Sequence, residues 1–325
     1  MNEIISIENA QLKYDISNNL FDSKKEFIYA LNNLSLKIYK NEILGLVGES
    51  GCGKSTLGKA IIKLLRLNSG KILFKNKNIN SFNKTELNDF RKKTAFIFQN
   101  PYASLNPRMN IFDILKEPLV IHKYGNFKQI KDKIESIIEL TGLEKNMLYR
   151  YPHEFSGGQR QRIAIARSLV LDPEFIIADE PVSALDVSIQ AQIINLLIDL
   201  KNKLNLTILF ISHDLNVIKF ISNRIAVMYL GEIVELADTK TLFNNPKHPY
   251  TKALLSAIPQ IDTDHKFYDQ KFQLKGELPS PKNPPLGCKF HTRCPFKLSI
   301  CSDVLPDQII LNDNHLIRCH LYKNL

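Results

Sequence analysis

The sequence predicts an α/β fold organised around a phosphate-binding loop, and two stretches of the chain carry this prediction. Residues 48–55, Gly-Glu-Ser-Gly-Cys-Gly-Lys-Ser, fit the pattern G-x-x-x-x-G-K-[ST] at every defined position. Residues 175–178 are apolar and run into Asp179 and Glu180, the usual metal-binding and catalytic end of a strand in a phosphate-loop sheet. A simpler explanation of residues 48–55 is an ordinary glycine-rich turn, and a simpler explanation of Asp179 and Glu180 is a cap before a proline. The two stretches occurring in one chain disfavour both.

Size and composition are those of a soluble globular protein. The chain has 325 residues, of which 44% are hydrophobic and 23% charged, and no apolar run is long enough to cross a membrane. The N-terminus carries Glu3 where a signal peptide needs a basic residue, so we expect a cytoplasmic protein. The formal charge of +10 favours an anionic membrane surface or a lysine-rich solvated surface over nucleic acid, because no basic run has interleaved aromatic residues.

The glycine loop has the flanks that its chemistry needs. Residues 43–47 predict a strand buried on both faces, and apolar residues recur at helical spacing after Lys54. The glycines let backbone N–H groups converge on phosphate oxygens at a helix N-terminus. Lys54 adds a positive charge for the β- and γ-phosphates, and the Ser55 hydroxyl suits Mg²⁺. The predicted nucleotide-binding residues of this loop are Gly48, Glu49, Ser50, Gly51, Cys52, Gly53, Lys54, Ser55 and Thr56.

The N-terminal part predicts strands between residues 4 and 37, interrupted by a polar surface loop at 15–25. Residues 34–38 alternate between apolar and polar side chains, as a half-exposed antiparallel strand does. Tyr14 is placed where its ring could stack on an adenine, although a core or surface tyrosine fits as well.

After the first helix we expect a short strand at 71–74, a polar stretch at 75–89, and a strand at 94–98 that ends at Gln99. Two prolines in residues 100–107 argue against regular helix there. Helical periodicity follows from 111 to 148.

A second helix N-terminus is predicted to bind anions. Ser156, Gly157 and Gly158 directly precede a helical stretch at 160–167, and Pro173 lies beyond its end.

Further along, residues 183–186 predict a turn and 189–204 a helix. A buried strand at 207–211 leads to His213, beside the carboxylate strand, where a catalytic role is a better interpretation than a structural one. Residues 225–228 and 233–236 predict a hairpin.

The C-terminal part changes character near Ser256, where we place a domain boundary. A short helix at 252–257 and a charged linker to 271 are followed by a proline-rich stretch at 276–285. Four of the five cysteines then occur in the last 40 residues, and a cytoplasmic chain rarely keeps disulfides, so the cluster points to a metal or iron–sulfur centre. The candidate ligands are Cys288, Cys294, Cys301 and Cys319.

Taken together, these motifs resemble the ATP-binding subunits of ABC transporters almost from end to end. Residues 48–55 are similar to the Walker A loop, Gln99 to the Q-loop, and 155–159 to the LSGGQ signature with Phe in place of Leu. Residues 175–179 are similar to Walker B, 183–186 to the D-loop, and His213 to the switch histidine. The resemblance implies an ATP-binding domain at 1–255, with a RecA-like core, an antiparallel β subdomain and a helical subdomain at about 100–170.

The C-terminal part resembles the extension of oligopeptide and dipeptide importer ATPases, in residues 248–254 and 276–281. This implies a cysteine-containing extension at 256–325, a subunit of the type lettered F, and import of peptides. Nickel importers share the extension, so nickel or a nickel chelate stays an alternative cargo. In several relatives the cysteines hold a [4Fe–4S] cluster, and the spacing C-x5-C-x6-C-x17-C matches that tail. Zinc is the alternative, although structural zinc sites favour tighter cysteine pairs.

The resemblance also implies roles for the site residues. Lys54 holds phosphates, and Mg²⁺ is bound by Ser55, Gln99 and Asp179. Glu180 acts as general base and His213 donates to the γ-phosphate. The signature residues Ser156, Gly157, Gly158 and Gln159 close on the ATP of a partner subunit, because one chain cannot cradle one ATP twice.

The implied partners are a second, homologous ATPase subunit, two transmembrane permeases and, indirectly, an extracytoplasmic peptide-binding protein. Residues 101–109 would form the groove for a permease helix, which places the chain on the cytoplasmic face of the cell membrane. The rival class is a soluble ABC ATPase that acts on ribosomes or DNA. Such chains usually carry two cassettes or a long coiled coil, and this chain has neither.

Overall fold

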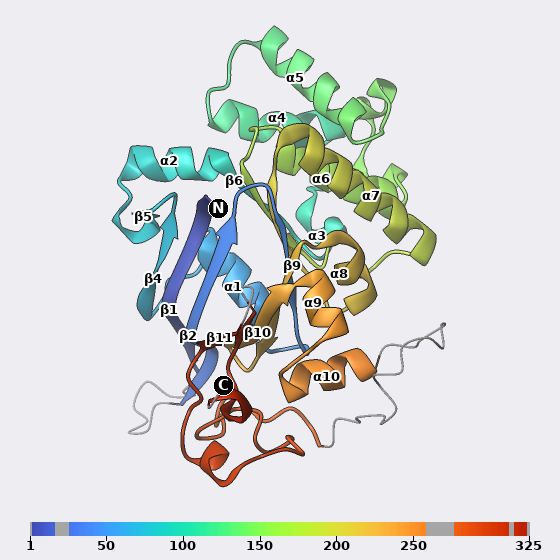
Figure 1. Cartoon of the computed structure of the whole chain (residues 1–325). Coiled ribbons are helices and arrows are strands. Elements are labelled where there is room, and N and C mark those ends of the chain that lie inside the picture. The colour runs from blue at the N-terminus through green and yellow to red at the C-terminus, as the bar shows by residue number, and fades with distance from the viewer. Residues whose placement is uncertain (1, 17–25, 258–275, 312–314, 324–325) are drawn as a thin grey trace.

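The computed structural model describes residues 2–16, 26–257, 276–311 and 315–323. The polar loop predicted at 15–25 and the charged linker predicted up to 271 lie largely outside these residues. Two sheets and a helical lobe make up the molecule (Figure 1).

The larger sheet positions the predicted site. Its strand order is β11-β12-β10-β9-β3-β8-β7-β6, in which β9, β3, β8, β7 and β6 run parallel and the other three join antiparallel. Every residue of β3, β7 and β8 is buried, as expected for strands covered on both faces. The strands are β3 (Ile43–Val47), β6 (Thr94–Ile97), β7 (Phe175–Asp179), β8 (Thr207–Ile211), β9 (Arg224–Tyr229), β10 (Glu232–Asp238), β11 (Ile309–Ile310) and β12 (Leu316–Ile317).

The smaller sheet is antiparallel, with the order β2-β1-β4-β5, and lies beside β10 (Figure 1). The alternation predicted at 34–38 is confirmed, since Leu34, Leu36 and Ile38 are buried and Lys37 is exposed. The predicted hairpin is confirmed as well, because β9 pairs with β10 next to Gly231. The strands of the smaller sheet are β1 (Glu3–Asp15), β2 (Phe27–Tyr39), β4 (Ser69–Phe74) and β5 (Lys77–Asn78).

Helices cover the parallel sheet and form the lobe at the top of Figure 1. The predicted helices at 160–167, 189–204 and 252–257 are confirmed with slightly different ends, whereas the helical periodicity expected from 111 to 148 is divided between two helices, Ile111–Ile121 and Phe127–Leu140, and a 3₁₀ turn. The helices are α1 (Lys54–Ile61), α2 (Lys84–Lys93), α3 (Pro101–Ser104), α4 (Ile111–Ile121), α5 (Phe127–Leu140), α6 (Gly157–Leu169), α7 (Val187–Leu204), α8 (Leu215–Ile221), α9 (Thr239–Asn244) and α10 (Pro249–Ser256), with 3₁₀ turns at Ile79–Ser81, Lys145–Tyr149, Pro152–Glu154, Ser299–Ser302 and His320–Tyr322.

Four of these helices were not predicted, namely α2, α3, α8 and α9. The stretch at 100–107 was expected to exclude regular helix, which is wrong for the single turn of α3, because a proline at the first helical position loses no hydrogen bond. Helix α2 lies within and beyond the predicted polar stretch. It buries only Phe90, so its periodicity is weak, but Asn83 and Glu86 form a capping box that is a readable start signal.

The C-terminal extension packs into the body of the molecule. Strand β12 pairs with β10, and Phe290 stacks edge-on against Tyr229 with ring centroids 5.3 Å apart. Cys288, Phe290 and Cys301 belong to the same buried cluster as the helical lobe and one face of the parallel sheet. The extension therefore shares its core with the larger sheet.

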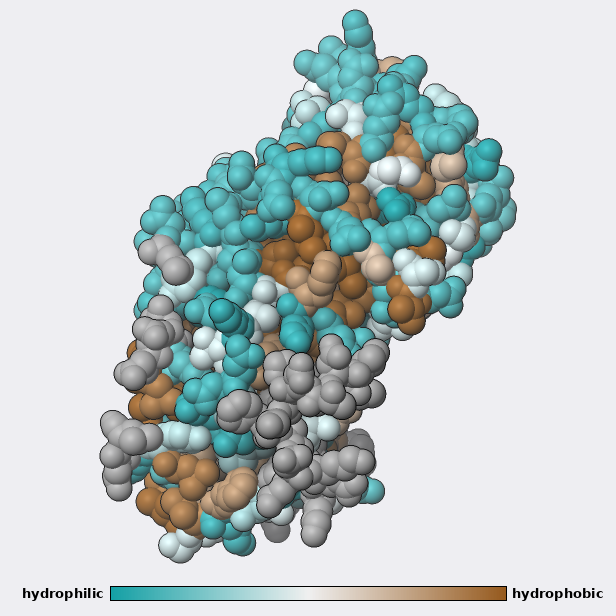
Figure 2. Space-filling view, turned by 45° about the vertical axis from the view of Figure 1, so that its right-hand side comes forward, coloured by the Kyte–Doolittle hydropathy of each residue, from teal (hydrophilic) through white to brown (hydrophobic). Residues whose placement is uncertain are grey.

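Most of the surface in Figure 2 is hydrophilic, with brown hydrophobic areas in the middle of this face and at its foot. The foot lies at the level of the extension in Figure 1. Exposed apolar side chains of the extension are Leu286, Phe296, Leu298, Ile300, Val304, Leu305, Ile310 and Leu321. Concentrated apolar surface of this kind is typical of proteins that assemble with partners.

Candidate functional site

The predicted phosphate loop connects β3 to α1 and has the conformation that its glycines allow. Gly48 and Gly53 have φ angles of 155° and 107°. A Cβ on Gly48 would lie 2.2 Å from the Met228 carbonyl oxygen, and one on Gly53 would lie 2.2 Å from that of Ala30. No side chain caps α1, so the first N–H groups of this helix have no side-chain acceptor. The loop is thus built for close backbone approach to an anion.

Lys54 lies inside the loop. Its ammonium group donates to the backbone oxygens of Gly48 at 2.7 Å and Glu49 at 3.0 Å, and the residue is only 6% exposed. These two carbonyl oxygens accept hydrogen bonds from the Lys54 ammonium group, and a phosphate oxygen could replace them as acceptors.

Ser55 and Asp179 meet at the predicted Mg²⁺ position. The Ser55 hydroxyl donates at 2.9 Å to Oδ1 of Asp179, the last residue of β7. Burial raises the pKa of Asp179, which the Ser55 hydrogen bond partly offsets. A hydroxyl and a buried carboxylate are oxygen ligands that suit Mg²⁺, so this pair fits the predicted ion.

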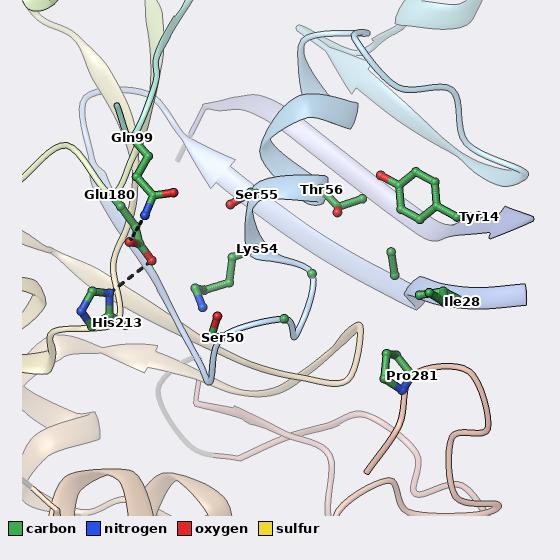
Figure 3. A pocket seen from close by; sticks show the side chains of 13 residues that line it. Tyr14, Ile28, Ser50, Lys54, Ser55, Thr56, Gln99, Glu180, His213 and Pro281 are labelled. Atoms are coloured by element: carbon green, nitrogen blue, oxygen red, sulfur yellow. Dashed lines mark hydrogen bonds and ion pairs between the residues drawn. The ribbon is translucent and has the colours of Figure 1, made fainter. Parts of the chain in front are cut away.

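Glu180 is held by both of its predicted neighbours. Gln99 Nε2 donates to its Oε2 at 2.8 Å, and His213 Nδ1 lies 3.2 Å from its Oε1 (Figure 3). Glu180 has a φ of 48°, a left-handed conformation that is unusual outside glycine, and its N–H donates to the Ile211 carbonyl at 2.9 Å. Strained backbone of this kind is often found at functional sites.

Except for Asp179, these residues line one cavity of about 500 Å³. Tyr14 lies at one end of it and the Glu180 group at the other, with Lys54 and Ser55 between them (Figure 3). The predicted residues that line the cavity are Tyr14, Ser50, Gly51, Gly53, Lys54, Ser55, Thr56, Gln99, Glu180 and His213.

Other predicted residues do not line the cavity. Gly48 and Glu49 belong to the loop but are not among the residues that line the cavity. The Cys52 side chain is buried, and this burial raises the pKa of its thiol. The signature residues Ser156, Gly157, Gly158 and Gln159 lie at the start of α6 and are not among the lining residues. Only one of the two predicted anion-binding helix ends therefore faces this cavity.

Three lining residues were missed by the sequence reasoning, namely Ile28, Ala30 and Pro281. Ile28 pairs with Tyr14 across β1 and β2, so a strand pairing would have indicated it. Pro281 comes from the C-terminal extension, where its carbonyl accepts from the Tyr29 N–H at 3.1 Å. The sequence holds no signal for that contact.

The four tail cysteines are gathered in the extension. Cys288, Cys301 and Cys319 are buried, and all four are free thiols. Burial, together with repulsion from the neighbouring cysteines, raises the pKa of Cys288 to about 12 and that of Cys319 to about 11. Within the described ranges, no three or more His, Cys, Asp or Glu side chains are arranged to hold a metal ion. The donor chemistry suits a thiolate-bound centre, whereas the present side-chain arrangement does not form one.

Comparisons with known proteins match the chain in two segments. The ABC transporter family matches residues 31–183, and the C-terminal region of oligopeptide/dipeptide transporters matches residues 234–301. The oligopeptide transport ATP-binding protein AppF of Bacillus subtilis (strain 168) is 48% identical over 98% of both chains. The oligopeptide transport ATP-binding protein OppF of Haemophilus influenzae is 46% identical over 97% of this chain and 96% of its own.

Among solved structures, a dimeric ATP-binding cassette in a post-hydrolysis state with ADP and Pi superposes with a TM-score of 0.64. It is 29% identical and covers 72% of this chain and 98% of its own. No helix in the described part of the chain combines the length and apolar character that a membrane crossing requires.

Proposed function

Since the chain belongs to the ATP-binding proteins of ABC transporters that carry the oligopeptide/dipeptide C-terminal region, we propose that it powers the import of oligopeptides or dipeptides. The observation that supports ATP hydrolysis most directly is the cavity that Lys54, Ser55, Glu180 and His213 share. Its two ends differ, with an aromatic ring at one and a carboxylate held by two side chains at the other.

For the phosphates, we assign Lys54 and the loop amides to the β- and γ-groups. Ser55, Asp179 and Gln99 would hold Mg²⁺, which would neutralise phosphate charge during transfer. The 2.9 Å contact between Ser55 and Asp179 supports the first two ligands. Gln99 donates to Glu180 through Nε2, and its amide oxygen is the atom that would bind the ion.

Glu180 is assigned as the general base for the attacking water. It accepts hydrogen bonds from Gln99 and faces His213, which would donate to the γ-phosphate. His213 is 60% exposed at its side chain, so it can move between the carboxylate and a phosphate without breaking a packed core. At the other end Tyr14, 38% exposed on β1, is assigned to stack on the adenine.

We assign the signature residues Ser156, Gly157, Gly158 and Gln159 to a second ATP, held by a homologous sister subunit. Their place outside the cavity supports this, because they cannot serve the ATP of their own chain there. Two sites at a head-to-tail interface then open and close together. The sister ATPase, two permeases and an extracytoplasmic binding protein complete the proposed importer, with this chain on the cytoplasmic face.

For the permease contact we assign a groove beside α3, of about 320 Å³. It includes Ser104 from the predicted segment, the apolar Phe98 next to Gln99, and Arg167. Arg167 also donates to the Ser104 carbonyl at 2.8 Å. A permease helix in this groove would lie beside Phe98, and the next residue in the chain, Gln99, belongs to the ATP site.

Reconstitution tests this function. The chain alone should hydrolyse ATP slowly, and adding the sister ATPase, the permeases and peptide-loaded binding protein in proteoliposomes should raise the rate. Stimulation by a nickel chelate but not by peptides would contradict the peptide cargo. Full peptide-coupled activity of the isolated chain, or two copies of it per transporter, would contradict the heterodimer.

For the extension at 256–325, we assign Cys288, Cys294, Cys301 and Cys319 to a [4Fe–4S] cluster, with zinc as the rival. Buried thiols with raised pKa values stay protonated at neutral pH, and a bound cation would release the protons. Protein purified without oxygen should be brown, with about four iron and four sulfide per chain, and Cys294→Ser should bleach it. Colourless protein with one zinc would favour the rival, and metal-free protein with an ordered tail would contradict both.

A further inference from the structure

One residue of the phosphate loop, Glu49, is held through each of its polar groups. Its N–H donates to the Tyr250 hydroxyl at 2.9 Å, and its carbonyl accepts from Lys54 at 3.0 Å. Its carboxylate pairs with the Arg293 guanidinium, with Arg293 Nη1 2.9 Å from Oε1 and 3.1 Å from Oε2. Two of the three partners, Tyr250 and Arg293, come from the last third of the chain. The loop residue is therefore anchored from outside the strand–loop–helix unit.

Arg293 is placed rigidly for this contact. Its side chain is 7% exposed, and its N–H donates to the Phe290 carbonyl at 3.0 Å in a turn that begins at Cys288. The next residue is Cys294, so the turn that presents Arg293 is also the one that carries two of the tail cysteines. A buried guanidinium with a fixed backbone presents its charge in one place.

An aromatic cluster supports both anchors. Tyr250 lies 4.7 Å from Tyr229 and 5.4 Å from Phe290, measured between ring centroids. Tyr229 also accepts a long contact of 3.5 Å from Arg293. Tyr250 and Phe290 are almost fully buried, so the hydroxyl that receives the Glu49 N–H is fixed by packing.

Two physical effects follow for nucleotide binding. A loop with several glycines has many backbone conformations, and fixing it before ATP arrives removes an ordering cost from binding. In addition, a carboxylate in a phosphate loop repels the triphosphate unless a cation neutralises it. Arg293 supplies that cation from behind the loop, where it does not occupy the cavity.

We propose that Arg293 is a positioning residue for the ATP site: through Glu49 it holds the phosphate loop in its binding conformation and cancels the charge of that carboxylate. We call the Arg293–Glu49 ion pair the latch. It rests on ATP binding by the loop and makes the cysteine-containing extension a determinant of nucleotide affinity.

A double-mutant cycle on the full chain tests the latch. Fluorescent ATP analogue is titrated into wild type, Arg293→Ala, Glu49→Gln and the double variant, with Lys297→Ala as the control because Lys297 is exposed in the same extension. We expect Arg293→Ala to bind ATP about tenfold more weakly, since residues in contact couple measurably. Glu49→Gln should cost less because it removes the repelling charge, and the double variant should match Glu49→Gln. Lys297→Ala should match wild type.

Two further readouts separate positioning from a general loss of folding. In the assembled transporter, Arg293→Ala should raise the KM for ATP about tenfold and leave kcat within about twofold, and Arg293→Lys should recover part of the affinity. Hydrogen exchange at residues 48–53 should accelerate in Arg293→Ala, while the sheet strands keep wild-type protection.

Three results would overturn the proposal. An ATP affinity of Arg293→Ala within about twofold of wild type would show that the latch does not affect nucleotide binding. An undiminished effect of Arg293→Ala in the Glu49→Gln background would show that the arginine acts through folding of the extension. If the wild-type chain binds no ATP, the proposed ATP site is wrong, and the proposal of the latch fails with it.

Discussion

Helices α1 and α6 both begin in a glycine-containing segment, but the N–H groups of their first turns have different acceptors. The α1 N-cap is Gly53, with no side chain that accepts from the helix. The α6 N-cap is Ser156, whose hydroxyl accepts from the Gln159 N–H at 3.3 Å while the Gln159 side chain accepts from the Ser156 N–H at 3.0 Å. The first helix end leaves its donors open, and the second has a complete capping box.

The difference teaches that a helix N-terminus alone does not define an anion site. Both ends carry the same dipole. Only α1 combines open amides with a lysine and with a cavity shaped by two other strands. Helix α6 instead packs its glycines against α7, where a Cβ on Gly158 would lie 2.5 Å from Ile189. In the proposed importer, a second subunit would bring a phosphate to that end.

The largest expected effect separates catalysis from binding at the α1 end. Glu180→Gln keeps the shape of the side chain but removes the carboxylate that we propose as the base, so turnover in the assembled transporter should fall by about 10²–10⁴ while ATP binding is kept. Steady-state hydrolysis and nucleotide binding measured on the same preparation check it. Hydrolysis within about twofold of wild type would show that another group is the base.

A matched pair of substitutions compares the two helix ends directly. Lys54→Ala should weaken ATP binding to the isolated chain about a hundredfold, because it removes charge-assisted hydrogen bonds. Ser156→Ala should leave that binding unchanged and lower turnover of the assembled transporter about tenfold. Nucleotide titration and ATPase assays on both variants give the contrast. Equal losses of binding in the isolated chain would break the comparison.

A third helix end offers a pH-dependent test of stability. The α10 N-cap is His248, whose Nδ1 accepts from the Tyr250 N–H at 3.0 Å and must therefore be neutral. Burial lowers the pKa of His248 to about 4 from 6.5. Between these two values the unfolded chain binds a proton that the folded chain lacks, so stability falls as the pH drops from 6.5 to 4, by about 3 kcal/mol in total.

Urea midpoints between pH 7.5 and 4.5 measure this loss. His248→Asn is the control, because asparagine caps helices without titrating and should flatten the pH dependence. Equal slopes for the two proteins would mean that other groups, rather than the buried imidazole, set the acid stability.

Much of the fold could be predicted because its signals are local. The phosphate loop, the buried strands β3, β7 and β8, and the hairpin of β9 with β10 each lie within a few neighbouring residues of the pattern that predicts them. Helix α2 was missed because one buried residue gives almost no periodicity, and α3 because a proline was taken as a general helix breaker.

The sequence by itself determined which residues could bind phosphate, since glycine, lysine and serine at fixed spacing act through adjoining backbone. Only the tertiary structure decided which of them share a cavity, and that Pro281 completes its wall. It also brought Tyr250 and Arg293 to Glu49, across separations of 201 and 244 residues. Contacts of that range leave no periodicity in the chain, because they depend on how β10, α10 and the extension pack together after each has formed.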